Sequence, residues 1–105
     1  MNLLEFIFYL KNPSKIEEVI LQENKELDID YADIYLEKEL CIYSKMFFLD
    51  AEQIDGKIEI ELNGKKYINL FPLDYLQDIF AEFNEQGNTD LEIANKILSF
   101  RINDA

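Results

Sequence analysis

The sequence predicts an α+β domain in which a small antiparallel sheet with a central hairpin is packed by N-terminal and C-terminal helices. Three observations support this fold class. Alternating aliphatic residues flank an Asn-Gly pair in the middle of the chain, and apolar residues at helical spacing occur on both sides of it. With 105 residues, of which 49% are hydrophobic, the chain has the size and apolar content of a single domain over residues 1–105.

Two short helices are expected at the start of the chain. The segment Leu3 to Leu10 is apolar on nearly all sides, which predicts a helix buried on more than one side, and Pro13 ends it. Ser14 and Glu17 have the spacing of a capping box, and the apolar residues that follow recur at helical spacing to about Glu23. We therefore expect a second short helix that is capped at Ser14.

An acidic run from Glu23 to Glu39 overlaps the first predicted strand. It contains seven acidic side chains and only two lysines. Ile34 and Leu36 occur at alternate positions within it, and the following segment, Leu40 to Leu49, is rich in aromatic and β-branched residues. We expect two strands, joined by a tight connection at residues 37–39.

The clearest local signal is a hairpin over residues 57–70, in which two alternating runs flank Asn63-Gly64. A two-residue loop would pair Leu62 with Lys65 and put the aliphatic residues of the two runs on opposite faces. A three-residue loop would pair Glu61 with Lys65 and put them all on one face. We expect the three-residue loop, with Gly64 in a left-handed conformation. The aliphatic residues concerned are Ile58, Ile60, Ile68 and Leu70.

Two helices are expected in the last third of the chain. After Pro72 an apolar stripe predicts the first, and Gly87 ends it in a left-handed C-cap. Thr89 and Glu92 form a second capping-box pattern, which opens the last helix. The stripe of the first helix consists of Leu73, Leu76, Ile79, Phe80 and Phe83, and the inward-facing residues of the second are Leu91, Ala94, Ile97, Leu98 and Ile102.

The residue types that most enzyme sites need are missing. The chain has no histidine and a single cysteine, Cys41, which excludes Ser-His and Cys-His nucleophile systems and a thiolate metal cluster. Cys41 itself is expected to be a buried, reduced thiol. Asp28, Asp30 and Asp33 have part of the spacing of a calcium loop, but Asp33 stands where that loop needs glycine. We therefore expect no enzyme, no cofactor and no metal site.

The net charge of −12 limits the partners of this chain, because it repels phosphate backbones and anionic membranes. Direct nucleic-acid binding and membrane binding are not expected. The segment Leu3 to Leu10 is about half as long as a membrane span and follows no basic segment, so neither a span nor a secretory signal is expected and the expected location is cytoplasmic. The excess charge serves either solubility or the binding of a basic protein.

A partner-binding patch is predicted in the acidic run, where acid density is highest and two tyrosines occur. A phenol offers apolar area together with a hydrogen bond, as interface residues often do, although such tyrosines are equally typical of half-buried strand positions. The predicted patch consists of Asp28, Asp30, Tyr31, Asp33, Tyr35 and Glu37.

The C-terminal third, from Leu70 to Ala105, contains a Leu-Gln-Asp-Ile helix segment, a Gln-Gly stop, a capped final helix and a terminal Asn-Asp-Ala. With these features it resembles the end of small acidic immunity proteins of bacterial contact-dependent growth inhibition and related polymorphic toxin systems. The resemblance implies that the chain neutralises a cognate toxin in the cytoplasm of the producing cell. Toxin domains of such systems are often nucleases, whose basic clefts an acidic protein can occupy.

Two other classes of function compete with this hypothesis. The first is a nucleic-acid mimic that inhibits a DNA- or RNA-binding enzyme, for which a regular row of carboxylates is expected. The second is a small carboxylate-dependent hydrolase or metal protein, which would need convergent acidic residues in a concave site.

Overall fold

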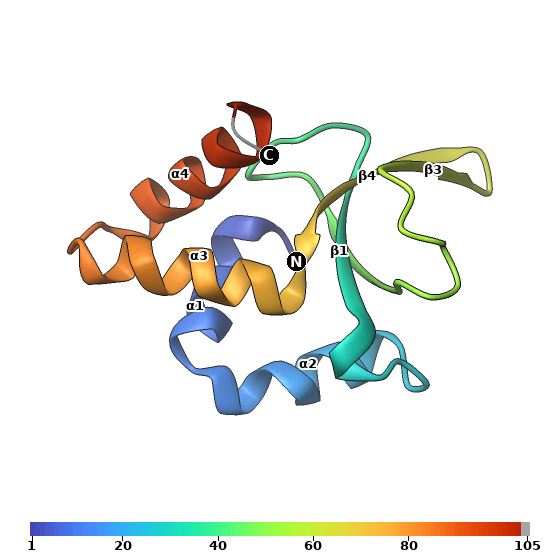
Figure 1. Ribbon diagram of the computed structural model, residues 1–105, viewed down its shortest axis with the longest axis horizontal. Coiled ribbons are helices and arrows are strands. Elements are labelled where there is room, and N and C mark those ends of the chain that lie inside the picture. Colours follow the sequence, from blue (N-terminus) through green and yellow to red (C-terminus); the bar gives the residue numbers. More distant parts are fainter. Residues whose placement is uncertain (104–105) are drawn as a thin grey trace.

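The computed structural model describes residues 1–103, which form a four-stranded antiparallel sheet and four α-helices (Figure 1). The predicted α+β fold is therefore confirmed. The helices are α1 (Leu3–Lys11), α2 (Ile16–Glu23), α3 (Leu73–Glu85) and α4 (Asp90–Asn103), with two short 3₁₀ turns, η1 (Pro13–Lys15) and η2 (Ile29–Tyr31). The strands are β1 (Ala32–Glu37), β2 (Met46–Asp50), β3 (Glu59–Leu62) and β4 (Lys65–Pro72), in the order β2-β1-β4-β3.

The helices gather on one side of the sheet, and the β3–β4 hairpin points away from them (Figure 1). Ile34 and Leu36 of β1 face the helices and are fully buried, as the alternation of this strand predicts. Phe6 of α1 packs against Phe48 of β2, with ring centroids 5.5 Å apart. The core of the domain therefore lies between the helices and one face of the sheet.

A β-bulge in β4 turns two consecutive side chains into this core. Ile34 lies opposite Phe71 and Tyr35 lies opposite Asn69, so Leu70 is an extra residue on β4. Leu70 and Phe71 are both buried. Strict alternation would have placed one of them on the opposite face of the sheet.

The hairpin has a two-residue loop, so the predicted three-residue loop is wrong. Leu62 lies opposite Lys65. Asn63 (φ 54°) and Gly64 (φ 78°) both have left-handed backbone, which a two-residue turn of the Asn-Gly type requires. The left-handed conformation expected for Gly64 is confirmed, but the turn determined the register against the hydrophobic pattern.

This register separates the aliphatic residues that were expected to share one face. Leu70 is buried in the core, whereas Ile58 is 66% exposed and Leu62 is 45% exposed. The hydrophobic pattern failed as a guide because the hairpin extends beyond the helices, so neither face of β3 is covered by them (Figure 1). A pattern of alternate aliphatic residues fixes the register only where one face has something to pack against.

The second strand is shorter than predicted. It begins at Met46, and residues 38–45 form a loop in place of a tight connection. Ile42, in this loop, is buried, and its carbonyl accepts a hydrogen bond of 3.5 Å from the N–H of Leu4 at the start of α1. The apolar residues of the loop therefore pack against the helices and do not extend the sheet. Cys41, expected to be buried, is half-buried here.

The capping box predicted for the last helix is confirmed. The N–H of Glu92 donates to Thr89 Oγ1 at 3.2 Å, and the N–H of Thr89 donates to Glu92 Oε1 at 2.8 Å. Hydrogen bonds from the backbone and the side chain of Thr89 to the Glu92 carboxylate lower the pKa of Glu92 below its ordinary value. Gly87, with a φ of 78°, follows the end of α3 as predicted.

The capping box predicted at Ser14 is wrong. Residues 13–15 form η1, and α2 begins at Ile16 without a side-chain cap, because Pro13 fits the first position of a tight turn. A capping box that the sequence analysis missed lies at Asn2 and Glu5, at the start of α1.

The inward face of α4 is only partly as predicted. Ala94 and Ile97 are fully buried, but Leu91 is 47% exposed and Ile102 is 57% exposed. Relative to the predicted orientation, α4 is rotated about its axis, so that Ile93 is fully buried and Leu91, which was expected to face inward, is exposed. Asp104 and Ala105, which end the segment that carries the resemblance, lie outside the described residues.

Candidate partner-binding surface

Three residues of the predicted patch lie in or beside η2, just before β1. Oδ1 of Asp28 accepts a hydrogen bond from the N–H of Asp30 at 3.0 Å, so the Asp28 side chain fixes the start of this turn. Asp28 and Asp30 are exposed, and Tyr31 is 45% exposed. All three are accessible to a partner.

Asp33 lies on the face of β1 that points away from the helices, and it is buried. Nδ2 of Asn69 donates to Oδ1 of Asp33 at 2.7 Å. Burial raises the pKa of Asp33 above its ordinary value, and hydrogen bonds from Asn69 and from the backbone of Ile34 oppose this shift. Asp33 therefore supports the sheet and offers little surface to a partner.

Tyr35 lies on the same face of β1 and is fully buried. Its hydroxyl donates to the backbone carbonyl of Lys57. Together with a bond of 2.7 Å from the N–H of Asn69 to the carbonyl of Ile58, this contact holds the connection between β2 and β3 to the sheet. Burial and the neighbouring carboxylate of Asp33 raise the pKa of Tyr35 to about 12. In this conformation Tyr35 is a structural residue.

Glu37 lies at the opposite end of β1 from Asp33. Its carboxylate is 3.4 Å from Nζ of Lys65, and its side chain is 17% exposed. At a rise of about 3.3 Å per residue, the four steps from Asp33 to Glu37 cover roughly 13 Å. The predicted patch thus divides into an exposed group before β1, a buried pair within it and an ion-paired residue at its end.

The fold brings further acidic residues to the start of β1. Ala32 lies opposite Asp50, the last residue of β2. Asp33 lies opposite Pro72, which directly precedes α3, and α3 packs against η2. We call the resulting surface the acidic end, and it consists of Asp28, Asp30, Tyr31, Asp50, Glu52, Asp74 and Tyr75.

The carboxylates of the acidic end lack cationic partners. Within residues 1–103 the ion pairs join Lys11 to Asp90, Lys65 to Glu37 and Lys66 to Glu59, all outside this surface. The Asp74 carboxylate contributes to the raised pKa of the neighbouring Asp33, so these two carboxylates are close enough to interact. Tyr31 and Tyr75 are 45% and 44% exposed. The surface can therefore attract cationic groups and offer aromatic contacts to them.

Sequence reasoning missed the part of this surface that comes from β2 and α3. Asp74 was not included in the predicted patch, and it lies far from the acidic run along the chain. Pairing of β1 with β4 is what brings the start of α3 to η2. The order of strands in a sheet has no local sequence signal, so this grouping could be found only from the fold.

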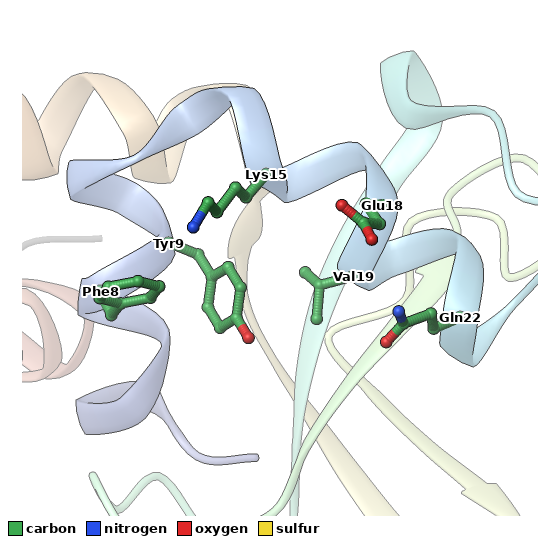
Figure 2. A pocket seen from close by; sticks show the side chains of 6 residues that line it. All are labelled: Phe8, Tyr9, Lys15, Glu18, Val19 and Gln22. Atoms are coloured by element: carbon green, nitrogen blue, oxygen red, sulfur yellow. The ribbon is translucent and has the colours of Figure 1, made fainter.

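A hollow of ≈250 Å³ lies between α1 and α2 (Figure 2). Phe8 is 51% exposed at its edge, although its helix was expected to be buried on more than one side. In Figure 2 the Lys15 ammonium points toward Phe8, and its Nζ is 5.5 Å from the ring centroid. The hollow offers aromatic area with charges of both signs, and is lined by Phe8, Tyr9, Lys15, Glu18, Val19 and Gln22.

None of the protein-family models, curated proteins or solved structures that we compared with this chain matches it. Within residues 1–103, no three acidic or cysteine side chains are arranged to hold a metal ion. No described helix has both the length and the apolar character needed to span a membrane. The functional evidence is therefore the geometry and charge of the acidic end.

Proposed function

We propose that this chain is an immunity protein that binds and neutralises a basic toxin, most suitably a nuclease domain, in the cytoplasm of the producing cell. The observation that carries the proposal is the acidic end, where carboxylates from three separate elements meet without ionic partners beside two exposed tyrosines. The net charge of −12 and the resemblance of the C-terminal third to immunity proteins support the same function.

The two kinds of side chain at the acidic end have different roles in this proposal. The carboxylates of Asp28, Asp30 and Asp74 attract a basic cleft and orient it during association. Tyr31 and Tyr75 supply apolar contact area and hydroxyl groups, as aromatic residues do at the centre of many interfaces. Asp33 and Tyr35 act beneath this surface by fixing β1 and the connection that covers it.

The first experiment is a growth assay. The chain is expressed together with the C-terminal domain of the secreted protein that is encoded immediately upstream of its gene. We expect that domain to be toxic alone and the chain to restore growth. An unrelated metabolic gene at that position, or cells that die despite the chain, would contradict the proposal.

The second experiment locates the contact surface. A variant with Asp28→Asn, Asp30→Asn and Asp74→Asn should associate with the toxin domain more slowly than the unmodified chain, and the difference between the two association rates should be largest at low salt. The difference should shrink as the Debye length falls from about 10 Å at 0.1 M to about 3 Å at 1 M. Stopped-flow kinetics at several salt concentrations measure it. Unchanged association rates at low salt would remove the acidic end from the contact surface.

One observation favours the alternative of a nucleic-acid mimic. Asp74, Asp78 and Glu82 occur every four residues along the exposed face of α3, about 6 Å apart along the helix axis. A variant with Asp78→Asn, Glu82→Gln and Glu85→Gln neutralises as many charges as the previous one, but along α3. It should behave like the unmodified chain if the acidic end binds the partner. If a mimic is at work, this variant loses inhibition instead.

A further inference from the structure

The two edges of the sheet differ in how their backbone is covered. On the β2 edge, the N–H of Met46 donates to the carbonyl of Met1 at 2.8 Å, and the Glu23 carboxylate lies beside the backbone of Phe48. The β3 edge protrudes beyond the helices (Figure 1). Natural sheets usually cover or block their edges, since an open edge pairs readily with another chain.

The outward backbone groups of β3 belong to Glu59 and Glu61. Leu62 flanks the two-residue loop, and residues in that position direct their N–H and C=O to the opposite strand. Ile58 also directs its backbone groups toward β4, because its carbonyl accepts a hydrogen bond of 2.7 Å from the N–H of Asn69. The backbone groups of Glu59 and Glu61 therefore point away from β4, and within residues 1–103 no turn or loop bonds to them.

The side chains of β3 and the preceding Ile58 lie on the two opposite faces of the sheet. Those of Glu59 and Glu61 project to one side of the sheet, and those of Ile58, Ile60 and Leu62 project to the other. A hollow of ≈390 Å³ runs along the strand, lined by all four residues of β3 together with Gln53, Ile54, Asp55 and Lys57. The edge thus combines free backbone groups, an exposed apolar face and an acidic face, on which Glu59 is 3.3 Å from Nζ of Lys66 and Glu61 has no ion pair among the described residues.

We infer that β3 is a docking site for an extended segment of another protein that alternates basic and apolar residues. Such a segment would add to the sheet as a fifth strand, bonded to the free backbone groups of Glu59 and Glu61. In the docked segment, the residues opposite Glu59 and Glu61 lie on the same face of the sheet as these glutamates. Lysine or arginine at these positions would pair with the two carboxylates. The residue opposite Ile60 shares the apolar face. This inference holds for any basic partner and does not require that the partner is a toxin.

A second copy of this chain is a poorer occupant of the edge. Antiparallel pairing of two β3 strands with their apolar faces on the same side sets Glu59 and Glu61 of one copy against the same residues of the other. Like charges directly opposite each other destabilise a sheet. Two chains that each have a net charge of −12 also repel one another at a distance. The charge pattern therefore favours a basic segment.

The probe for this site is a short synthetic peptide that alternates lysine and valine and has blocked ends. We expect it to bind and to slow amide hydrogen exchange at Glu59 and Glu61, while exchange at Phe48 on the covered edge stays unchanged. The control is a peptide of the same composition with its lysines contiguous. Equal affinity for the two peptides would overturn the proposal, since it would show attraction to net charge alone.

Two substitutions separate the backbone from the charge. Glu61→Pro removes an outward N–H that no bond to β4 uses, and an edge strand tolerates proline at such a position. Glu61→Gln removes the same charge and keeps the N–H. We expect Glu61→Pro to bind the peptide about tenfold more weakly than Glu61→Gln, a difference of about 1.4 kcal/mol, since the hydrogen bond from this N–H to the peptide is lost.

Two further measurements keep this test decisive. Thermal melts show whether Glu61→Pro is folded. If it is not, a peptide whose lysine residues are methylated at the backbone nitrogen removes strand hydrogen bonds from the partner's side, and it should fail to bind. Equal binding to Glu61→Pro and Glu61→Gln would overturn the docking site. Sedimentation that shows a dimer of the free chain, abolished by Glu61→Pro, would assign the edge to a second copy instead.

Discussion

β1 has two buried faces, and they are buried by different means. On the helical face, Ile34 and Leu36 are surrounded by apolar residues of the core. On the other face, Asp33 and Tyr35 are buried with polar contacts, to Asn69 and to the carbonyl of Lys57. Apolar burial contributes about 1.5 to 3 kcal/mol per large side chain, whereas a hydrogen bond contributes a net of about 1 kcal/mol.

This contrast shows that residues of a single strand can be equally buried and still contribute differently to the stability of the domain. Neighbouring residues of β1 are equally inaccessible to solvent. The free energy of unfolding should nevertheless depend strongly on the residues that face the helices and weakly on those that face the 51–58 connection. The contrast also explains why a patch chosen for its density of acidic residues and tyrosines contains two buried residues, Asp33 and Tyr35. Three substitutions test the contrast, beginning with the largest expected effect.

Leu36→Ala should destabilise the domain by about 2 to 5 kcal/mol, because it removes a fully buried side chain and leaves a cavity in the core. That is a large share of the roughly 5 to 15 kcal/mol that a domain has in total. Urea unfolding measures the change. The matched control is Leu62→Ala, in which the same side chain is 45% exposed and the expected cost is within about 0.5 kcal/mol. Equal costs would break the distinction between the two positions.

Much of the fold was predictable because its signals are local. The apolar stripe after Pro72, the left-handed Gly87 and the Thr89 capping box all involve residues close together in sequence, and the structure has all three. The hairpin register was not predictable from hydrophobicity, since Ile58 and Leu62 alternate without any partner to bury them. There the Asn-Gly turn was the better signal.

The candidate site was less predictable than the fold. The exposure of Asp28, Asp30 and Tyr31 agrees with a surface role. These residues precede β1, so the alternation of side chains along a strand does not determine their exposure. The burial of Tyr35 depends on a connection that folds back over the sheet and bonds to it through Lys57. The contribution of α3 to the acidic end depends on the strand order. Neither feature can be seen in a local pattern.

Tyr35→Phe should have an intermediate effect, a loss of about 0.5 to 1.5 kcal/mol, because it removes only the hydrogen bond to Lys57. The released connection should exchange its amide hydrogens faster over residues 51–58, which hydrogen exchange measures by mass spectrometry. Tyr43→Phe, at a position 64% exposed, is the control and should change neither quantity. A loss as large as that of Leu36→Ala would show that the two faces contribute alike.

The same substitution should change the stability at alkaline pH. The pKa of Tyr35 is about 12 in the folded chain against 10.0 for an ordinary tyrosine. The unfolded chain therefore loses this proton first, and the stability that it contributes below pH 10 is lost as the pH rises towards 12. Denaturant unfolding between these pH values should show a flatter decline in Tyr35→Phe than in the unmodified chain. Parallel declines would contradict the raised pKa.

Asp33→Asn should have the smallest effect, and it should be stabilising at neutral pH. Burial raises the folded-state pKa of Asp33 above its ordinary value of 3.8, so the folded chain prefers the protonated side chain. Asparagine resembles that neutral form, and its carbonyl oxygen can still accept the hydrogen bond from Asn69. The charged aspartate loses its contribution as the pH rises through the raised pKa. The advantage of the variant should therefore grow from below pH 3.8 towards neutral pH.

The pH dependence separates this charge effect from any change in packing at Asp33. A packing change would give the same difference in unfolding free energy at every pH, whereas the cost of a buried charge disappears once the carboxyl is protonated in both the folded and the unfolded chain. Asp30→Asn, at an exposed position, changes the net charge by the same amount and serves as the control in denaturant unfolding between pH 3 and pH 7. If both variants gave equal differences at every pH, the raised pKa of Asp33 would be rejected, and the face of β1 that carries Asp33 would tolerate a charge as well as the surface does.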